Sequence, residues 1–561
     1  MQYKAIIGQW GDDMNIGFKE DLTIEFKSDK NKLPDSDLVD AVVAFANTNG
    51  GDIYLGIEDD GEITGLHKSH QDITQLAAFI ANKTVPPIAV RAEKSEDKQY
   101  LKISVPKSRS IVASSSGKIQ RRRIKADGTP ENVPMYPHEI ASRLSDLSLL
   151  DYSSLCVPDA TYSDLDPVER ERLRSIIRMN PQGEQNLLEL DDEELDKALR
   201  LVADNNRQLV PTYCGMLLIG RTDSLRGCVP TAEAAFQVMN GTNVILNESF
   251  LLPLLAAFEK METYMNARNT ESEIEEGLFR ISVPDYNKRA FREALVNAFS
   301  HRDYTMMGRV RVQMDNDGLT ISNPGGFIEG VTIDNLLTVE PHGRNTALAD
   351  AMKRIGLAER TGRGVDRIFE GSLLYGKPLP DYSESTNVMV KLFIPKSLPD
   401  PNFTRLISEE HRTTGESLPI NSLLVLNALK LNRRATVNEL AEFSHITVEK
   451  ARITAERLVE SGMIEPSGNG KGRCYTLSAK LYQANNNISG YIRQKGIDSI
   501  RYPEMVLQFA KENGGTITRG DVMELLHLTK SQAYNLLKKM VDDDKLDLKG
   551  TTRNAYYILK H

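Results

Sequence analysis

The sequence predicts a mixed α/β (α+β) protein built from several domains. Its 561 residues correspond to roughly three to five domains of about 150 residues each. Helix-type apolar periodicity alternates with strand-like runs until about residue 395. Two similar units, each with three helical patterns followed by a two-stranded hairpin, then close the chain.

The composition limits the classes of function. With 69 Lys+Arg against 78 Asp+Glu, the net charge of -9 disfavours a bulk-basic nucleic-acid binder, although local basic faces can still bind phosphate. The four cysteines form no CxxC pair, so they indicate neither a zinc ribbon nor a disulfide scaffold. No GxxxxGK[ST] occurs, which excludes a P-loop motor or helicase.

The pattern of apolar residues predicts no targeting signal. The start of the chain lacks the apolar core of a signal peptide, and no run of about 18 apolar residues could span a bilayer. We therefore expect a reduced, cytoplasmic protein without a membrane partner.

The first α/β unit is expected over residues 1–150. Leu38–Ala46 has a helical pattern, and Asp52–Ile57 alternates as a strand does. Asn49–Gly51 supplies the turn between them, because glycine accepts a positive φ at little cost.

Four charged residues near this strand could form a catalytic group. Glu20 and Glu25 lie five residues apart on an extended segment, so a bend must intervene if they converge. With Asp59 they could hold Mg²⁺ or Mn²⁺, which prefer oxygen ligands and activate water, while Lys27 neutralises a phosphodiester. The alternative is a solvated surface on which Lys27 pairs with a glutamate.

A family resemblance accompanies these residues. Its stretches are Glu20 with Ile24-Glu-Phe-Lys, Ala44-Phe-Ala-Asn-Thr-Asn-Gly-Gly, Tyr54-Leu-Gly-Ile-Glu-Asp-Asp-Gly-Glu-Ile-Thr-Gly and Arg121-Arg-Arg-Ile-Lys-Ala-Asp-Gly. They resemble the Schlafen AlbA_2 domain over most of residues 14–145. The resemblance implies nucleic-acid binding. Some Schlafen members cleave RNA with two glutamates and an aspartate, which correspond to Glu20, Glu25 and Asp59, with Lys27 nearby.

The same resemblance makes a basic run the expected contact to phosphate. Arg121, Arg122 and Arg123 would bind it through their forked donors. The alternative is a solvated basic strand end.

A second α/β unit follows an acidic helix expected around Leu187–Leu195. We expect strands, helices and a hairpin in this order: strands at Cys214–Gly220 and Ala232–Val238, helices at Phe250–Tyr264 and Phe291–Phe299, and a hairpin of Val310–Met314 and Leu319–Asn323.

The second of these helices carries a spacing suited to a nucleotide. Glu293 and Asn297 lie four apart on one helix face, where Asn297 could coordinate Mg²⁺ and Glu293 could orient or deprotonate a water. Glycines that let backbone amides approach phosphate follow at Gly325, Gly326, Gly362 and Gly364. The alternative is a plain amphipathic helix.

A second resemblance covers about residues 205–395. Its stretches are Tyr213-Cys-Gly-Met-Leu-Leu-Ile-Gly, Glu293-Ala-Leu-Val-Asn-Ala-Phe-Ser-His-Arg-Asp-Tyr, Ile321-Ser-Asn-Pro-Gly-Gly-Phe, Gly343-Arg-Asn and Glu359-Arg-Thr-Gly-Arg-Gly-Val. They resemble the divergent histidine-kinase/gyrase-type (GHKL-like, RecG-related) module, which implies ATP as cofactor, bound with or without hydrolysis. Asn323 stands near the place of the aspartate that reads adenine in the broader family.

His301 follows this helix without a serine or cysteine nucleophile to partner it. We interpret it as a cation at the helix end that bonds backbone carbonyls.

The two closing units have the order of a winged helix-turn-helix. Residues 421–480 carry 9 Lys+Arg against 6 Asp+Glu, a local basic excess. Recognition helices are expected at Thr447–Ser461 and Thr529–Val541. Base-edge contacts would come from Lys450, Arg452, Arg457, Lys530, Gln532 and Asn535, and wing contacts to phosphate from Lys471, Arg473, Lys549 and Arg553. The alternative is a pair of protein-protein modules.

The expected layout is a Schlafen AlbA_2 domain at 1–150, a helical connector at 151–204, the ATP-binding domain at 205–395, a linker at 396–418, and winged helices at 419–482 and 500–561. The first functional hypothesis is a metal-dependent nuclease acting in defence against foreign nucleic acid, with nucleotide state controlling a homo-oligomer. The second is a DNA-binding transcription regulator without catalysis. In both, the partner is DNA or RNA.

Overall fold

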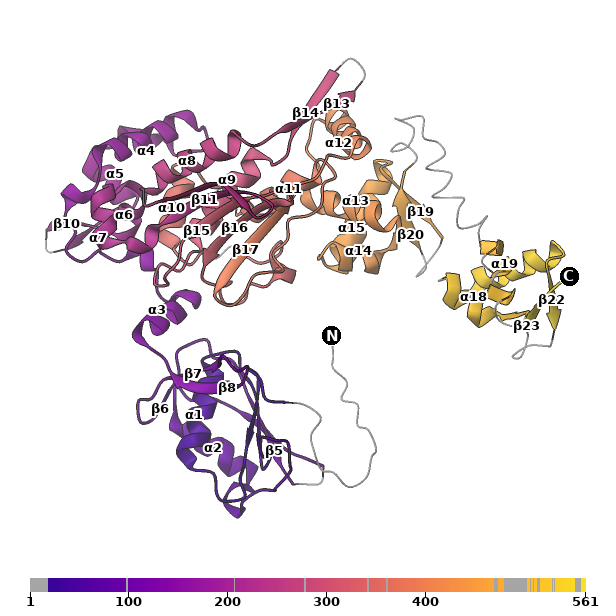
Figure 1. The fold of residues 1–561 in the computed structure, drawn as a ribbon, viewed down its shortest axis with the longest axis horizontal. Helices are drawn as coiled ribbons and strands as arrows, with labels where there is room; N and C mark the ends of the chain where they lie inside the picture. Colours follow the sequence, from indigo (N-terminus) through magenta and orange to yellow (C-terminus); the bar gives the residue numbers. More distant parts are fainter. Residues whose placement is uncertain are drawn as a thin grey trace.

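The computed structural model describes residues 19–96, 99–205, 207–276, 279–340, 343–359, 362–468, 473–478 and, with several short gaps, 502–560. Figure 1 shows successive units along the chain, the first joined to the central one through helix α3 (Pro137–Asp146). Within the described residues, no helix has the length and apolar character needed to cross a membrane.

The first unit is a four-stranded sheet with two covering helices and two short strand pairs. The sheet order is β1-β2-β5-β4, with β1 parallel to β2. Its elements are β1 (Ile24–Lys27), α1 (Asp35–Ala46), β2 (Gly51–Leu55), α2 (Ile73–Lys83), β3 (Thr84–Val85), β4 (Arg91–Lys94), β5 (Leu101–Val105), β6 (Ala113–Ser114), β7 (Gln120–Ile124) and β8 (Pro130–Pro134), with a 3-10 turn at Lys68–His70.

The motif after α1 organises this unit. Asn47 is buried and its amide bonds the backbone N–H and C=O of Val112 and the carbonyl of Gln120. Thr48 accepts the N–H of Arg122 at 2.9 Å. Gly51 has φ +142°, and a Cβ there would lie 2.2 Å from the carbonyl oxygen of Thr23, so only glycine fits. The motif therefore fixes β7 against α1.

The central unit is a five-stranded mixed sheet packed by helices. Its order is β12-β11-β15-β16-β17, in which only β11 and β15 run parallel. The strands are β9 (Val202–Asn205), β10 (Gln208–Pro211), β11 (Ala234–Asn240), β12 (Asn243–Phe250), β13 (Glu271–Glu276), β14 (Phe279–Pro284), β15 (Val310–Met314), β16 (Gly318–Pro324) and β17 (Met389–Pro395). The hairpin of β13 and β14 projects from the unit (Figure 1).

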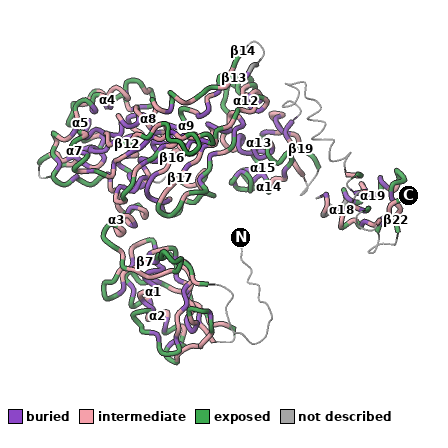
Figure 2. Tube along the Cα trace, in the orientation of Figure 1, coloured by how far each residue is buried: buried purple, intermediate pink, exposed green. Residues whose placement is uncertain are grey.

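The helices of this unit surround the sheet. They are α4 (Pro167–Met179), α5 (Asp192–Ala198), α6 (Tyr213–Ile219), α7 (Thr222–Cys228), α8 (Leu254–Asn266), α9 (Lys288–Ser300), α10 (Thr346–Arg354) and α11 (Gly364–Leu373), with 3-10 turns at Tyr152–Ser154, Tyr162–Asp164, Gln185–Glu189, Pro230–Ala232 and Ile333–Asn335. Figure 2 shows the buried chain concentrated along the sheet and its facing helices.

The expected strand at Cys214–Gly220 is wrong, because these residues form α6. Thr212 caps the helix by accepting the N–H of Gly215 at 3.1 Å, and most of the helix is buried. An apolar run of this length fits a buried helix as well as a strand, so periodicity could not separate them.

The expected connector at 151–204 also differs from the structure. Its apolar side chains, including Leu173, Ile177 and Leu195, belong to one core with the sheet and with α8 to α10. The expected acidic helix around Leu187–Leu195 is divided into the turn Gln185–Glu189 and α5, which Asp191 caps. These residues are thus part of the central unit.

The expected linker at 396–418 contains helix α12 (Pro401–Thr414). Asp400 accepts the N–H groups of Asn402 and Phe403, Pro401 stands at the first helical position, and Gly415 ends the helix with φ +74°. Phe403, with Leu406 and Ile407, is buried in the core of the next unit. Its apolar stripe was too short to stand out among the polar residues around it.

The third unit is α13 (Ile420–Asn432), β18 (Arg434–Thr436), α14 (Val437–Phe443), α15 (Val448–Glu460), β19 (Ile464–Ser467) and β20 (Cys474–Leu477). Its strands pair in the order β18-β20-β19. Thr436 and Glu439 form a capping box at the start of α14. Helix α11 packs on α13, and its residue Leu373 lies in the core of this unit.

The last described elements repeat this order. They are β21 (Thr516–Thr518), α18 (Arg519–Leu526), α19 (Lys530–Asp542), β22 (Leu546–Lys549) and β23 (Tyr556–Leu559), with sheet order β21-β23-β22. Ahead of them, positions 505, 508 and 512–514 lie outside the described residues.

Candidate nucleotide cavity, carboxylate cluster and basic helix face

A cavity of about 670 Å³ lies in the central unit, bordered by α9, α10, α11, β16 and β17. Six of the seven nucleotide-site residues expected from the sequence line it: Glu293, Asn297, Asn323, Gly326, Gly362 and Gly364. The seventh, Gly325, is next to the lining and holds a backbone with φ +94°. Residues from three separate stretches of the chain are thus brought together.

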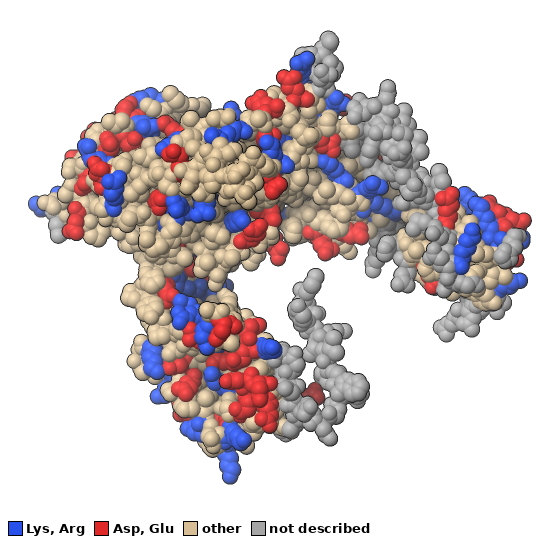
Figure 3. Space-filling view, in the orientation of Figure 1, with Lys and Arg blue, Asp and Glu red and all other residues tan. Residues whose placement is uncertain are grey.

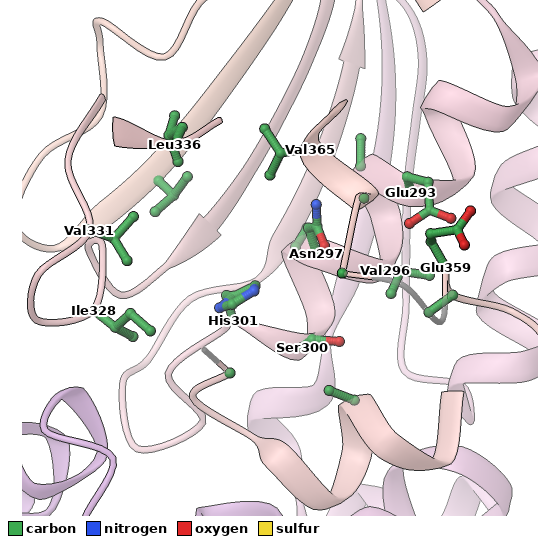
Figure 4. Close-up of a pocket in the computed structure, with 18 of the residues that line it drawn as sticks. Glu293, Val296, Asn297, Ser300, His301, Ile328, Val331, Leu336, Glu359 and Val365 are labelled. Carbon is green, nitrogen blue, oxygen red and sulfur yellow. The ribbon is translucent and has the colours of Figure 1, made fainter. Parts of the chain in front are cut away.

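Helix α9 presents its polar pair to the cavity. Asn287 caps the helix by accepting the N–H groups of Arg289 and Ala290. The opposite face places Phe291 and Leu295 in the core. Glu293 and Asn297, one turn apart, therefore face the cavity together, as Figure 4 shows.

Glu293 has an unusual environment for a carboxyl group. Its side chain is 6% exposed, and burial raises its pKa to about 7, with the charge of Glu359 as the next cause. Glu359 is itself paired with Arg289 at 2.7 Å and with Arg367 at 3.6 Å. A carboxyl group with this pKa can accept or release a proton near neutral pH.

The start of α11 closes against this pair. A Cβ at Gly364 would lie 3.0 Å from Oε2 of Glu293 and 3.6 Å from Oδ1 of Asn297. A larger residue would therefore press on the Glu293 carboxyl group, whereas its Cβ would make an ordinary contact with Asn297. The first backbone N–H groups of α11 border the same cavity, and such groups favour an anionic ligand.

The remaining wall combines an apolar surface with three cations. The apolar part comes from Ile328, Val331, Leu336, Leu337, Val339, Tyr382, Val390 and Leu392, and the cations are Arg200, Lys353 and Arg363. Sequence reasoning missed these residues, because the segment 327–340 has no helix or strand periodicity and the cations come from unconnected places. The spacing of Thr346, Ala349, Asp350 and Lys353 on α10 is the one signal that could have indicated a cavity-facing side.

His301 lies on the cavity wall beside Asn297 (Figure 4). Burial, then the charges of Arg344 and Lys353, lower its pKa to about 4. The expected helix-end cation is therefore wrong, since the imidazole is neutral near pH 7.

The amino-terminal carboxylates converge through the expected bend. Glu20 accepts the backbone N–H of Phe26 at 2.7 Å, which turns its side chain back onto β1. Burial is the largest cause that raises the pKa of Glu20, and the charges of Glu25 and Asp59 add to it while Lys27 opposes it. Glu25, Asp59 and Lys27 thus all act electrostatically on Glu20.

Glu25 is already neutralised by cations. It is 4% exposed and pairs with Lys27 at 2.5 Å and with Arg122. Nδ2 of Asn132 bonds both carboxylate oxygens at 3.2 Å. Among the described residues, no three carboxylate, histidine or cysteine side chains are grouped to hold a metal. The arrangement of Glu20, Glu25 and Asp59 in the structure therefore does not fit the Mg²⁺ or Mn²⁺ site expected from the sequence.

The three arginines of β7 have different environments. Arg122 is 3% exposed and lies 4.4 Å from the ring centroid of Phe45, so the expected phosphate contact is wrong for this residue. Arg121 pairs with Glu139 of α3, and Arg123 is half-exposed beside Glu131 at 2.6 Å. Alternation along the strand turns the middle side chain inward.

The expected base-reading residues of the third unit are exposed on two flanks of α15, with Lys450 and Arg457 on one flank and Arg452 on the other. Lys450, Arg452 and Arg457 of α15 are all exposed, and Arg473 pairs with Glu456 at 2.9 Å. On α19, Lys530, Gln532 and Asn535 are exposed. Lys471 and Arg553 lie outside the described residues.

Three family models match the chain. Residues 20–130 match the model described as "Schlafen, AlbA_2", residues 308–392 the one described as "Putative ATP-dependent DNA helicase recG C-terminal", and residues 142–235 a domain of unknown function. The last of these spans the expected connector and continues through α6 and α7. No curated protein matches the chain.

Solved structures add a likeness of fold. The DIP2311 protein from Corynebacterium diphtheriae is 20% identical, with 98% of this chain and 97% of that chain covered and a TM-score of 0.50. A MarR family transcriptional regulator from Silicibacter pomeroyi is 17% identical over 25% of this chain and 81% of its own, with a TM-score of 0.12. The mRNA-binding domain of elongation factor SelB from E. coli is 15% identical over 25% of this chain and 98% of its own, with a TM-score of 0.14. Scores as low as the last two carry no argument.

The family matches agree with both resemblances read from the sequence. The chain is a mixed α/β multidomain protein of a nucleic-acid-related kind that carries a Schlafen AlbA_2 domain and, after it, an ATPase-like domain of the recG C-terminal type.

Proposed function

We propose that this chain is a nucleic-acid-binding protein whose central cavity binds a magnesium nucleotide of the ATP type. The observation that carries the proposal is the cavity itself, where Glu293 and Asn297 meet the glycines of two distant loops. A volume of about 670 Å³ is in the range of small-molecule and cofactor sites.

Each wall of the cavity suits one part of a nucleotide. The amide oxygen of Asn297 is a suitable magnesium ligand, and the first turn of α11 favours phosphate. The apolar surface that includes Ile328 and Leu336 suits a base. Asn323, 4% exposed on the same wall, offers an amide for hydrogen bonds to that base.

The nucleic-acid part of the proposal depends on the exposed cations of α15. Lys450, Arg452 and Arg457 are close in sequence on a helix whose other face is buried. Three helices and a strand pair in this order fit a winged helix, in which such a helix enters the major groove. Binding by a placed basic face is consistent with the overall charge of -9.

The Asn297→Ala variant tests nucleotide binding. We expect its affinity for a nonhydrolysable ATP analogue with Mg²⁺, measured by calorimetry, to fall at least about tenfold, the loss of about 1.4 kcal/mol. Asn243→Ala, at the exposed first residue of β12, is the matched control and should bind as wild type does. Equal affinity in both variants would place the nucleotide elsewhere.

Cleavage of nucleic acid at the carboxylate cluster is the second candidate function. The convergence of Glu20 with Glu25, Asp59 and Lys27 favours it, although Glu25 would first have to leave its cations. Such a nuclease would suit a role in defence against foreign nucleic acid.

Labelled RNA and DNA, incubated with Mn²⁺ or with EDTA, test this candidate. Wild type should cleave one of them only with the metal, and the Glu20→Ala/Glu25→Ala variant should not. If wild type cleaves neither nucleic acid, the regulator without catalysis is favoured, and a defined site should then outcompete random DNA at fixed salt. Equal cleavage by wild type and variant would remove the activity from Glu20 and Glu25.

A further inference from the structure

Helix α3 lies between the first unit and the wall of the cavity. Its residues Ser142, Arg143 and Asp146 contact three side chains of the central unit, Asp303, Glu329 and Arg344. We call these six residues the α3 joint. Asp303 and Arg344 come from the His-Arg-Asp and Gly-Arg-Asn stretches, and neither of these two residues lines the cavity itself.

Arg344 is the centre of the joint. It is 2% exposed and pairs with Asp146, with Asp303 at 3.6 Å as a second carboxylate. Its Nε donates to the carbonyl of His301 and its Nη2 to the carbonyl of Gly326, both at 3.1 Å. His301 and Gly326 line the cavity, so one buried guanidinium binds both the cavity wall and α3.

Asp303 makes the second connection. It is 1% exposed, accepts the hydroxyl of Ser142 on α3, and accepts the N–H of Thr305 at 2.9 Å. Arg143 adds a third, since it donates to Glu329 at 3.0 Å and to the carbonyl of Ser108 in the first unit at 2.8 Å. Ion pairs and hydrogen bonds between buried partners with defined geometry are either formed or broken, and they do not lengthen gradually.

The other end of α3 reaches the carboxylate cluster. Glu139 caps α3 by accepting the N–H of Tyr136 and also pairs with Arg121 of β7. The next residue of β7 is Arg122, the buried partner of Glu25. Helix α3 thus connects Arg344, at the wall of the cavity, to strand β7, whose Arg122 pairs with Glu25.

We propose that a nucleotide in the cavity controls the amino-terminal unit through the α3 joint, so that occupancy changes how firmly β7 holds Glu25. The inference rests on the proposed nucleotide site. A ligand that contacts His301 or Gly326 acts on the carbonyls that Arg344 bonds, and any change in Arg344 is felt by Asp146.

Amide hydrogen exchange of the full chain tests the coupling. The nonhydrolysable ATP analogue with Mg²⁺ should change the exchange of the β7 and β1 backbone by about threefold or more in wild type. Asp146→Asn and Ser142→Ala remove joint contacts without touching the cavity lining. Each should bind the analogue within about twofold of wild type and lose the change in β7. Asp192→Asn, an exposed ion-paired carboxylate elsewhere, is the control and should keep it.

The outcomes separate the two proposals. If wild type binds the analogue and β7 does not respond, or if the response survives in both joint variants, the coupling is overturned while the nucleotide site stands. If wild type binds no analogue, the proposed function fails, and the coupling fails with it. Should Asp146→Asn not fold, Ser142→Ala decides alone, because it removes only a hydroxyl.

Discussion

The residue with the clearest chemical signature is Glu293. It could be predicted from its four-residue spacing to Asn297, but its pKa of about 7 could not, because that value depends on burial and on Glu359. Glu359 lies 66 residues away in sequence from Glu293 and reaches it only through the packing of α11 on α9. The spacing of two residues along one helix identifies them as a pair. The pKa of either one depends in addition on every charged group that the fold places around it.

The pH dependence of stability tests the environment of Glu293. Its folded pKa of about 7 lies above the ordinary value of 4.5, so the folded state is penalised progressively as pH rises from 4.5 through about 7. Glu293→Gln removes this penalty. We expect the free energy of unfolding of this variant to increase relative to that of wild type as the pH rises, by up to about 3 kcal/mol above pH 7.

Urea unfolding near pH 5 and near pH 8 measures this difference. Glu409→Gln, on an exposed position of α12, should show no such trend. A Glu293→Gln difference that is the same at both pH values would contradict the assigned pKa.

The basic run of β7 shows what sequence cannot resolve at single residues. Arg121, Arg122 and Arg123 are chemically identical, yet the pleat sends only the middle one inward to Glu25. A prediction of which arginine is buried needs the register of β7 against β8 and the position of Phe45. His301 differs for the same reason, since its neutral state follows from burial beside other cations.

At the scale of elements, helices with long apolar stripes were predictable and short ones were not. The hairpin of β15 and β16 and the helices α1, α8 and α9 lie where their patterns place them, with ends that differ by a few residues. Helix α12 was missed because its buried face holds only three apolar residues, beside the polar Thr404. Its stability comes from the core it enters, which local sequence does not reveal.

Phe403→Ala tests the role of α12. We expect the third unit to lose about 3–5 kcal/mol of unfolding free energy, the usual cost of removing a buried phenyl ring. Thermal and denaturant unfolding measure the loss, and Glu409→Ala on the exposed side of the same helix should be nearly neutral. If Phe403→Ala is equally neutral, α12 does not contribute to that core.

The exposed face of α15 belongs to the same scale. Replacing Lys450, Arg452 and Arg457 by alanine should weaken DNA binding at least about tenfold and reduce the slope of log affinity against log salt by about 2–3. Fluorescence anisotropy over a salt series gives both values. A triple alanine variant at Arg178, Lys197 and Arg226, on other exposed helices, should leave the slope unchanged. An unchanged slope in the α15 variant would instead favour a protein-binding role.

At the scale of the whole molecule, acidic side chains gather on the visible face of the first unit, whereas charge is mixed over the central unit (Figure 3). Figure 3 shows Lys and Arg interspersed with Asp and Glu over the central unit, as the total of -9 implies. The order of the units was predictable from two resemblances and one repeat. How they join was not, because the α3 joint and the packing of α11 on α13 depend on contacts between residues far apart in sequence.

These contacts connect the cavity to both the first unit and the third unit. One wall reaches the first unit through Arg344, and α11 runs from the cavity at Gly364 to the core of the third unit at Leu373. A ligand in the cavity is therefore placed to influence both candidate nucleic-acid sites, which makes nucleotide binding the central claim.

A crystal structure of the full chain with Mg²⁺ and a nonhydrolysable ATP analogue tests this claim most directly. The account predicts the nucleotide between α9 and α11, with its metal about 2.1 Å from Oδ1 of Asn297 and its base against the apolar wall. An empty cavity in crystals that contain the bound analogue at another place on the chain would contradict it.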